Sequence, residues 1–255
     1  HIAATDTRIY AEVLADGFLT ETPMVVTAGS IVAVSALAVY LGVEVIGRSA
    51  DVLIPVIVLF FIISITAGLG LFDFRNLEPI MPKGIKPAIS GTITPVGVSV
   101  QFLSLGLLTP HLAEPEKVVT TSVVAVLLAG LSLIISSVVV IGALGPNLAS
   151  SAIFPLFKTA RSTMLTRFLE RLEAPGIAAW GLGLFIDVSI FLYCGSKGLA
   201  QLFEMKNYRP LVIPMAIIWI TLAIHTYEDL FDVLRLFRPE TLFPYVSVVG
   251  FLPVL

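Results

Sequence analysis

One apolar segment, residues 87–102, reads PAISGTITPVGVSVQF and continues as LSLGLLTP to residue 110. It is long enough to cross a bilayer, yet its first half holds glycines, an internal proline and several hydroxyl side chains. Pro95 lacks a backbone donor and clashes with the carbonyl of Gly91, and Gly97 adds a position without side-chain restraint. A helix interrupted in lipid must hide its freed backbone groups against protein or a watery cavity. The sequence therefore predicts a broken membrane helix.

Two interpretations of this break are open. Discontinuous helices form the midplane binding sites of many secondary transporters. The other interpretation is a kinked helix whose neighbours satisfy the loosened backbone, which is the commoner case for a single such segment. On its own, the break marks a candidate site and no more.

Composition places the whole chain in the membrane. Its 255 residues are 57% hydrophobic and 13% charged, and the mean hydropathy is +0.99, far from soluble usage. The net charge of −3 offers no basic patch for nucleic acid. With one cysteine, Cys194, and three scattered histidines, we expect no disulfide, metal site or cofactor. No nucleophile–base pair or phosphate loop favours an enzyme.

The chain is predicted to be an all-α integral membrane protein. The expected spans, six in whole or nearly so, are residues 24–43, 51–71, 87–110, 118–144, 175–203 and 210–225, and two cut pieces lie at the ends. Residues 152–174 mix Phe and Leu with Lys and Arg, which is typical of amphipathic helices that lie on the membrane or cap a bundle. Because the chain starts at His1 and stops in an apolar run, we expect a fragment of a longer protein.

Several motifs together resemble one family. They are YLGVEVIGR at 40–48, FRNLEPI at 74–80 followed by GIKP at 84–87, LLTPHL at 107–112, LERLE at 169–173, and QLF at 201–203 before YRPL at 208–211. In this order and spacing they resemble the B subunit of spore germinant receptors, a branch of the amino acid/polyamine/organocation transporter superfamily. The similarity covers nearly the whole chain, although no single motif is a catalytic signature.

The resemblance implies a single transporter-like domain over residues 1–255, with ten helices in a LeuT-like inverted repeat. On that template the chain lacks the first two helices and the end of the tenth. Residues 87–112 become the sixth helix, 152–174 the extracytoplasmic helical cap and 175–203 the eighth helix. Many members carry an acidic residue where this chain has Val98. A proton- or cation-linked role for that carboxylate is therefore in doubt here.

The resemblance also implies a function. The chain is expected to be a nutrient-sensing subunit in the spore inner membrane, among membrane lipids, that binds a small germinant, most simply an amino acid. It would signal to the A and C subunits of the receptor. A proton-coupled amino-acid permease is the alternative, and the residues alone do not separate the two. A purely structural scaffold is disfavoured because it gains nothing from the interruption at residues 95–97.

Candidate ligand contacts surround the break. Backbone N–H groups at a half-helix start hold a carboxylate, and freed carbonyls hold an ammonium, so an α-amino acid fits. For hydroxyls, a bond back to their own helix is an equally good interpretation, whereas an amide in lipid needs several partners. The candidates are Thr94, Gly97, Val98, Ser99 and Gln101.

Other candidates lie on two further helices. Ser189, Tyr193 and Ser196 recur at helical spacing and share a face, which the family template turns toward the site. Ser189 and Tyr193 are predicted contacts, with a packed, hydrogen-bonded tyrosine as the ordinary alternative. Near the start of the chain, Ala3 and Thr7 are interpreted as the wall of the third family helix, where small residues leave room for a small ligand.

Asp187 is the only acidic residue deep within a predicted span. An ionisable group in the membrane is a functional hypothesis by default, because its charge is costly unless paired or hydrated. It lies about 200° around the helix from Ser189, so both cannot point straight at one ligand. The interpretations are a protonated helix–helix hydrogen bonder or a contact with a partner subunit, with a ligand-ammonium role third.

Overall fold

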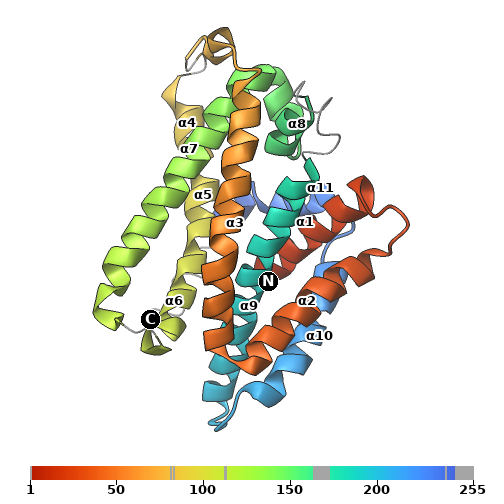
Figure 1. Cartoon of the computed structure of the whole chain (residues 1–255), viewed down its shortest axis with the longest axis vertical. Helices are drawn as coiled ribbons and strands as arrows, with labels where there is room; N and C mark the ends of the chain where they lie inside the picture. The colour runs from red at the N-terminus through yellow and green to blue at the C-terminus, as the bar shows by residue number, and fades with distance from the viewer. Residues whose placement is uncertain are drawn as a thin grey trace. The chain divides into compact units, whose positions relative to one another are not determined.

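The structure, a computed structural model, describes residues 2–80, 82, 84–111, 114–162, 173–238 and 240–244. Within these ranges every regular element is helical (Figure 1). The chain divides into two compact units. Unit 1 comprises His1–Ala50, Lys83–Pro115 and Leu184–Leu255, and unit 2 comprises Asp51–Pro82 and Glu116–Gly183. The predicted all-helical membrane class is confirmed.

Unit 1 is built around three packed helices: α1 (Ile2–Gly17), α2 (Met24–Leu41) and α10 (Arg209–His225). Small side chains such as Ala11, Ala28 and Ala223 are almost fully buried where these helices meet. Small residues let helix backbones approach closely in a membrane, where van der Waals packing drives association. The short α11 (Leu230–Leu236) follows α10 after a bend of 104°.

Helix α3 (Val43–Leu69) begins earlier than expected. The prediction that this span starts at residue 51 is wrong. Gly42 takes a φ of +128° and by itself separates α2 from α3. Glu44 and Arg48 then form an ion pair of 2.6 Å along the exposed first turns, an i,i+4 arrangement that supports a helix.

The predicted broken helix is a series of short helical pieces in unit 1. These are α4 (Ile85–Gly91), α5 (Ile93–Val98), the 3₁₀ turn η2 (Ser99–Ser104), α6 (Leu105–Leu108) and η3 (Thr109–His111). The interruptions lie on either side of Pro95 and Gly97, which are both inside α5. The backbone stays right-handed at Thr92 (φ −77°, ψ −16°) and Ser99 (φ −63°, ψ −12°). The helix is therefore loosened rather than opened into an extended strand.

Unit 2 contains α3 from Asp51 onward, the turn η1 (Phe74–Leu77), α7 (Val118–Ser151), α8 (Pro155–Ser162) and the first part of α9 (Glu173–Leu202). The helical dihedrals of α7 break at Gly145, with φ 74° and ψ 161°. This is where the sequence predicts the span to end. The helix resumes at once and reaches Ser151.

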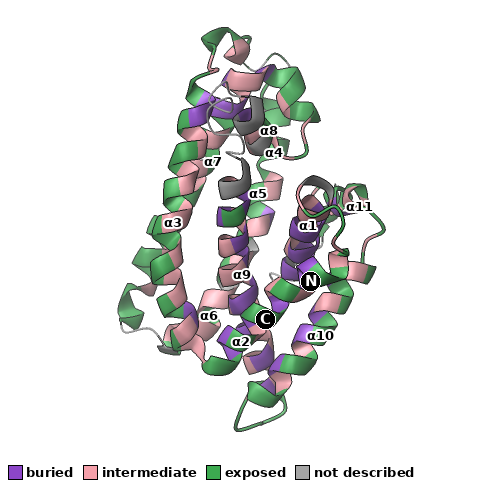
Figure 2. Ribbon diagram, turned by 45° about the vertical axis from the view of Figure 1, so that its right-hand side comes forward, coloured by how far each residue is buried: buried purple, intermediate pink, exposed green. Residues whose placement is uncertain are grey.

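Among the residues that the structure describes, four helical segments are long and apolar enough to cross a membrane: Met24–Leu41, Val43–Leu69, Pro115–Ser151 and Gly176–Leu202. Helices α10 and α11 make a fifth if they are taken as one bent span. The sixth expected span, residues 87–110, is cut into pieces too short to count alone. Residues along α1 and α9 are largely buried, whereas α3 and α7 are mostly exposed (Figure 2). Of the expected cap, α8 is helical, and residues 163–172 lie outside the described residues.

Candidate functional site

All ten residues singled out from the sequence lie in unit 1. They come from three parts of the chain: α1, the α5–η2 segment and the second half of α9. They are Ala3, Thr7, Thr94, Gly97, Val98, Ser99, Gln101, Asp187, Ser189 and Tyr193. That a ligand binds among them stays a prediction.

The α1 wall is tightly packed. Ala3 is 2% exposed, and Thr7 is fully buried with its hydroxyl donating to the Ala3 carbonyl at 2.8 Å. Because this hydroxyl is satisfied within its own helix, Thr7 contributes shape rather than a free donor. That the small residues of α1 leave room for a ligand stays a prediction.

Hydroxyl groups of the broken segment behave in two ways. Ser99 is exposed and donates to the Pro95 carbonyl, 2.8 Å away on the same segment. Thr94 instead donates to the carbonyl of Phe237, just beyond α11, also at 2.8 Å. Thr94 is therefore a tie between distant parts of unit 1, a role that the sequence did not reveal.

The other three positions of the segment differ in burial. Gly97 is buried, Val98 is half-buried, and Gln101 is half-buried on the 3₁₀ turn. Among the described residues no hydrogen bond to the Gln101 amide is found, although its backbone carbonyl accepts from Ser104 at 2.7 Å. An amide with this much capacity is the polar side chain of the segment best placed to accept a new partner.

On α9, the predicted stripe is buried and lies against the 3₁₀ turn. Ser189 is fully buried and donates to the Phe185 carbonyl at 2.6 Å. Tyr193 is 1% exposed, and its ring packs edge-on against Tyr208 with centroids 5.2 Å apart. One residue further, the Cys194 thiol contacts the Ser104 carbonyl at 3.6 Å, which places α9 beside η2.

Ser196 continues this stripe toward the end of α9. It is fully buried, and within the described ranges its hydroxyl has no hydrogen-bond partner. A buried polar group without a partner carries a desolvation cost of about 1–3 kcal/mol. The α9 stripe thus holds one satisfied hydroxyl, at Ser189, and one unsatisfied hydroxyl, at Ser196.

Asp187 has a neighbour that sequence reasoning missed. Both it and Asp6 on α1 are half-buried, and the Asp6 carboxylate acts electrostatically on Asp187. One residue before Asp6, the Thr5 hydroxyl shares a hydrogen bond of 3.0 Å with the Tyr227 hydroxyl. No sequence spacing relates residues 6 and 187, which lie on α1 and α9 of unit 1.

Arg8 is paired with Glu12 within α1 and links this helix to the end of α10. Arg8 is 4% exposed and pairs with Glu12 at 3.3 Å. Its guanidinium also donates to the carbonyls of Ile224 at 2.8 Å and Glu228 at 3.1 Å. A cation at a helix C-terminus satisfies carbonyls that lack intrahelical partners. The i,i+4 spacing of Arg and Glu within an apolar helix is the sequence signal that could have revealed it.

These three parts of unit 1 together present small side chains, backbone groups of a 3₁₀ turn, one amide and two carboxylates. Groups of these kinds are able to form hydrogen bonds and charge interactions with a small polar molecule. In the part of the chain that the structure describes, no group of three or more His, Cys, Asp or Glu residues is placed to hold a metal ion.

Comparison with known proteins agrees with the motifs. The model of the family described as spore germination protein matches residues 1–229. The chain is 30% identical over 241 residues to spore germination protein KB of Bacillus subtilis, covering 90% of the chain and 64% of that protein. It is 26% identical over 176 residues to spore germination protein XB of Bacillus anthracis, covering 69% of the chain and 49% of that protein.

Spore germination protein YndE of Bacillus subtilis is 25% identical over 210 residues, which cover 80% of this chain and 57% of that protein. The chain thus spans less than two thirds of each of these relatives. Neither the family description nor these names refer to a catalysed reaction. No solved structure matches the chain at a significant level. The resemblance drawn from the sequence motifs is confirmed.

Proposed function

Because the chain belongs to the spore germination protein family, we propose that it senses a nutrient germinant, an amino acid, bound within unit 1. It is a multi-pass integral membrane protein of the spore inner membrane. In this proposal the helices belong to a LeuT-like inverted repeat, and germinant binding is passed to the A and C subunits of the receptor. The names of the relatives support the germination role, and unit 1 supplies the binding groups.

The observation that carries the proposal is the loosened segment beside α9. From Ser99 to Ser104 the α-helical pattern gives way to a 3₁₀ turn, whose hydrogen bonds have poorer geometry than those of an α-helix. Backbone groups in such a turn exchange partners at lower cost. An amino-acid carboxylate would take N–H groups here, with Gln101 as a side-chain partner.

The ammonium end of the ligand has a natural counterpart in the two carboxylates. The Asp6 carboxylate acts electrostatically on Asp187, so a cation near both groups would offset the repulsion between them when both are ionised. Binding of a zwitterion would then join α1, α9 and the broken segment through one molecule. This gives Asp187 a ligand-directed role, which its position on the α9 sequence alone did not favour.

Signalling requires that the ligand prefer one packing of the protein over another. A ligand shifts a conformational equilibrium only by its differential affinity for the two states. The ties from Thr94 to Phe237 and from Arg8 to the end of α10 are the contacts in unit 1 that a repacking would alter. We place the response of the receptor in these contacts.

Asp6 and Asp187 also support a second candidate, a proton-coupled amino-acid permease, because carboxyl groups within membrane helices can act as proton relays. Uptake separates the two. Full-length protein in vesicles is offered a panel of twenty radiolabelled amino acids, with and without a pH gradient. Binding without accumulation supports the sensor, whereas saturable accumulation driven by the gradient supports the permease and overturns the sensor.

A residue test addresses the site itself. Gln101→Ala should weaken binding of the amino acid identified in that panel at least tenfold, since a hydrogen-bonded amide is lost. Gln201→Ala is the matched control, because Gln201 is exposed at the end of α9. Equal affinity of the two variants would show that the site is misplaced.

A further inference from the structure

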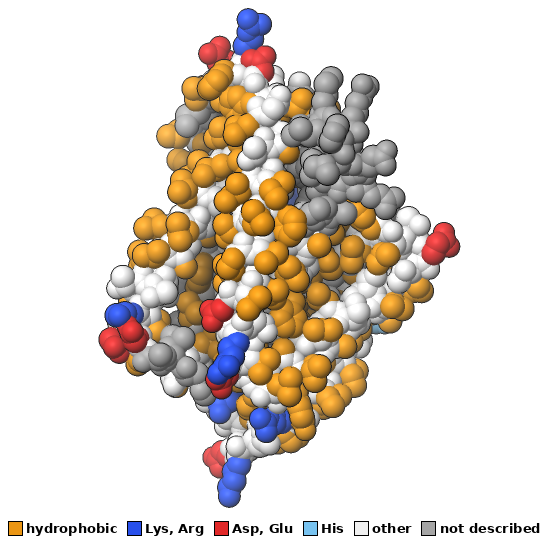
Figure 3. Space-filling view, viewed as in Figure 1, with side chains coloured by type: hydrophobic (Ala, Val, Ile, Leu, Met, Phe, Trp, Pro, Cys, Tyr) orange, Lys and Arg blue, Asp and Glu red, His pale blue; other side chains and the backbone are white. Residues whose placement is uncertain are grey.

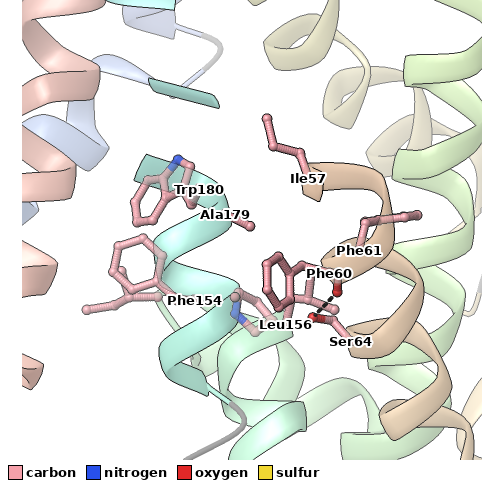
Figure 4. A pocket seen from close by; sticks show the side chains of 11 residues that line it. Ile57, Phe60, Phe61, Ser64, Phe154, Leu156, Ala179 and Trp180 are labelled. Carbon is pink, nitrogen blue, oxygen red and sulfur yellow. Dashed lines mark hydrogen bonds between the residues drawn. The ribbon is translucent and has the colours of Figure 1, made fainter. Parts of the chain in front are cut away.

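A second feature of the molecule is a cavity within unit 2 (Figure 4). It lies between α3, the residues around the start of α8, and the first turns of α9, and its volume is about 350 Å³. That size falls in the usual range for small-molecule sites, about 300–1,000 Å³. Its walls include Phe60, Phe61, Phe154, Leu156, Ala179 and Trp180. None of the residues proposed to bind the germinant lines it.

The walls of this cavity are apolar. The rings of Phe154 and Trp180 lie 5.7 Å apart at a tilt of 51°, and the side chains of α3 face those of α9 across the hollow (Figure 4). Ser64 is the one hydroxyl-bearing residue among the described lining residues, and it donates to the Phe60 carbonyl at 2.9 Å. A polar guest would lose most of its hydrogen bonds to water here without replacement. These walls therefore fit a hydrocarbon best.

The surroundings of the cavity identify the source of that hydrocarbon. Both α3 and α9 are long and apolar enough to span a membrane. Hydrophobic side chains cover the side of α3 seen in Figure 3, and Leu59 and Ile62 on this helix are 55% and 54% exposed. The medium around such a surface is lipid, so a lipid chain reaches the cavity without crossing water. We infer that the cavity holds an acyl chain of a membrane phospholipid.

Photolabelling tests this inference. Full-length protein is reconstituted with phosphatidylcholine that carries a diazirine on one acyl chain, irradiated, and mapped by mass spectrometry. Label should be enriched at least fivefold on Phe60 and Trp180 relative to Ile62 and Ile63, which are exposed on α3 and do not line the cavity. Equal labelling of the two groups means ordinary contact with surrounding lipid and overturns the inference.

Filling the cavity provides the matched comparison. Ser64→Leu places a hydrocarbon side chain in the hollow and should lower the label on Trp180 at least fivefold. Thr66→Leu is the control, because Thr66 is an exposed hydroxyl residue of the same helix whose proton is likewise bonded to a backbone carbonyl, that of Ile62. If Ser64→Leu fails to fold, Ala179→Leu fills the cavity from the α9 wall.

Two further results would overturn the inference. One is unchanged label on Trp180 in both cavity-filling variants. The other is label that appears with a free diazirine alcohol but not with the phospholipid, which would assign the cavity to a small apolar molecule instead. Amino-acid binding by the same variants is measured in parallel. Because the cavity residues and the proposed germinant contacts do not overlap, failure of one proposal leaves the other intact.

Discussion

Two apolar helices of this protein are interrupted by glycine and proline, with opposite outcomes. In α7 of unit 2, Pro146 has no N–H to give to the Gly142 carbonyl four residues earlier. In the broken segment of unit 1, Pro95 likewise has no N–H to give to the Gly91 carbonyl four residues earlier. The two breaks use the same residue types, so the difference between them lies in what surrounds them.

The break in α7 is sealed by the loop after α3. The Gly142 carbonyl accepts from the Asp73 N–H at 3.0 Å and from the Asn76 side chain at 2.8 Å. The Phe72 ring packs where a side chain on Gly142 would stand. The carbonyl that Pro146 leaves without an intrahelical donor is therefore satisfied by protein, as expected for a kink that serves structure.

The break around α5 is not sealed in this way. Among the described residues, no neighbouring segment supplies a donor to the Gly91 carbonyl, and Pro95 and Val96 are exposed. The segment relaxes instead into a 3₁₀ turn from Ser99 onward. A proline–glycine break is therefore informative about ligand binding only when its freed groups lack a protein partner, and the following variants test this distinction.

The largest effect is expected for Gly142→Ala. The new methyl group would overlap the ring of Phe72, and overpacking of this kind costs about 1–3 kcal/mol, here at the upper end. Unfolding of the purified protein in mixed SDS micelles measures the change. Gly130→Ala, on the same helix, is the control. No atom lies within 4 Å of the carbon added at Gly130, so this variant should be as stable as the parent or more stable.

Gly145→Ala comes next. Gly145 has a φ of 74° and a ψ of 161°, a region that is essentially restricted to glycine, and a residue held there is strained by about 1–3 kcal/mol. The same unfolding assay should show a loss of about 2 kcal/mol. An unchanged stability would mean that α7 straightens at no cost and that the contacts of Asp73 and Asn76 with Gly142 do not hold the kink in place.

Asn76→Ala should have a smaller effect. It removes one of two hydrogen bonds to the Gly142 carbonyl, and a single bond of this kind contributes about 1 kcal/mol. The Asp73 N–H remains, so the carbonyl is not left without a partner. Asn147→Ala, at an exposed position of α7, should lower the stability less. An equal loss of stability in both variants would show that the hydrogen bond from Asn76 does not stabilise the kink.

The smallest change in stability is expected for Pro95→Ala. Pro95 lies in the first turn of α5, where a backbone N–H often lacks an intrahelical partner, so restoring it changes stability by less than about 1 kcal/mol. Binding of the identified amino acid should nevertheless fall, because a restored donor to the Gly91 carbonyl favours a regular α-helix over the 3₁₀ turn proposed to bind the ligand carboxylate. A gain of about 3 kcal/mol would show instead that proline alone interrupts this helix.

Much of the fold could be predicted from apolar patterning and turn residues. The helices at residues 24–41, 118–151, 173–202 and 209–225 were found within a few residues of their ends, apart from the extension of α7 past Pro146. The start of α3 was misplaced because the charged residues Glu44 and Arg48 were expected to end the preceding span, whereas they lie in α3 and pair with each other along it.

The site was harder to predict, for physical reasons. Thr7, Ser99 and Ser189 all donate to their own helices, and a hydroxyl satisfied in this way is indistinguishable in sequence from one that binds a ligand. The contacts that join distant helices depend on packing. Asp6 near Asp187 and Arg8 at the end of α10 follow from helix–helix geometry, and no local pattern encodes that geometry.

One of the contacts described above carries a mechanical consequence. A threonine hydroxyl has a single proton, and that of Thr94 is given to the Phe237 carbonyl. If an acceptor group of a bound ligand took this proton, the hydrogen bond between Thr94 and Phe237 would be broken. The Thr94 hydroxyl can therefore donate either to a ligand or to the residue that follows α11, and never to both at once.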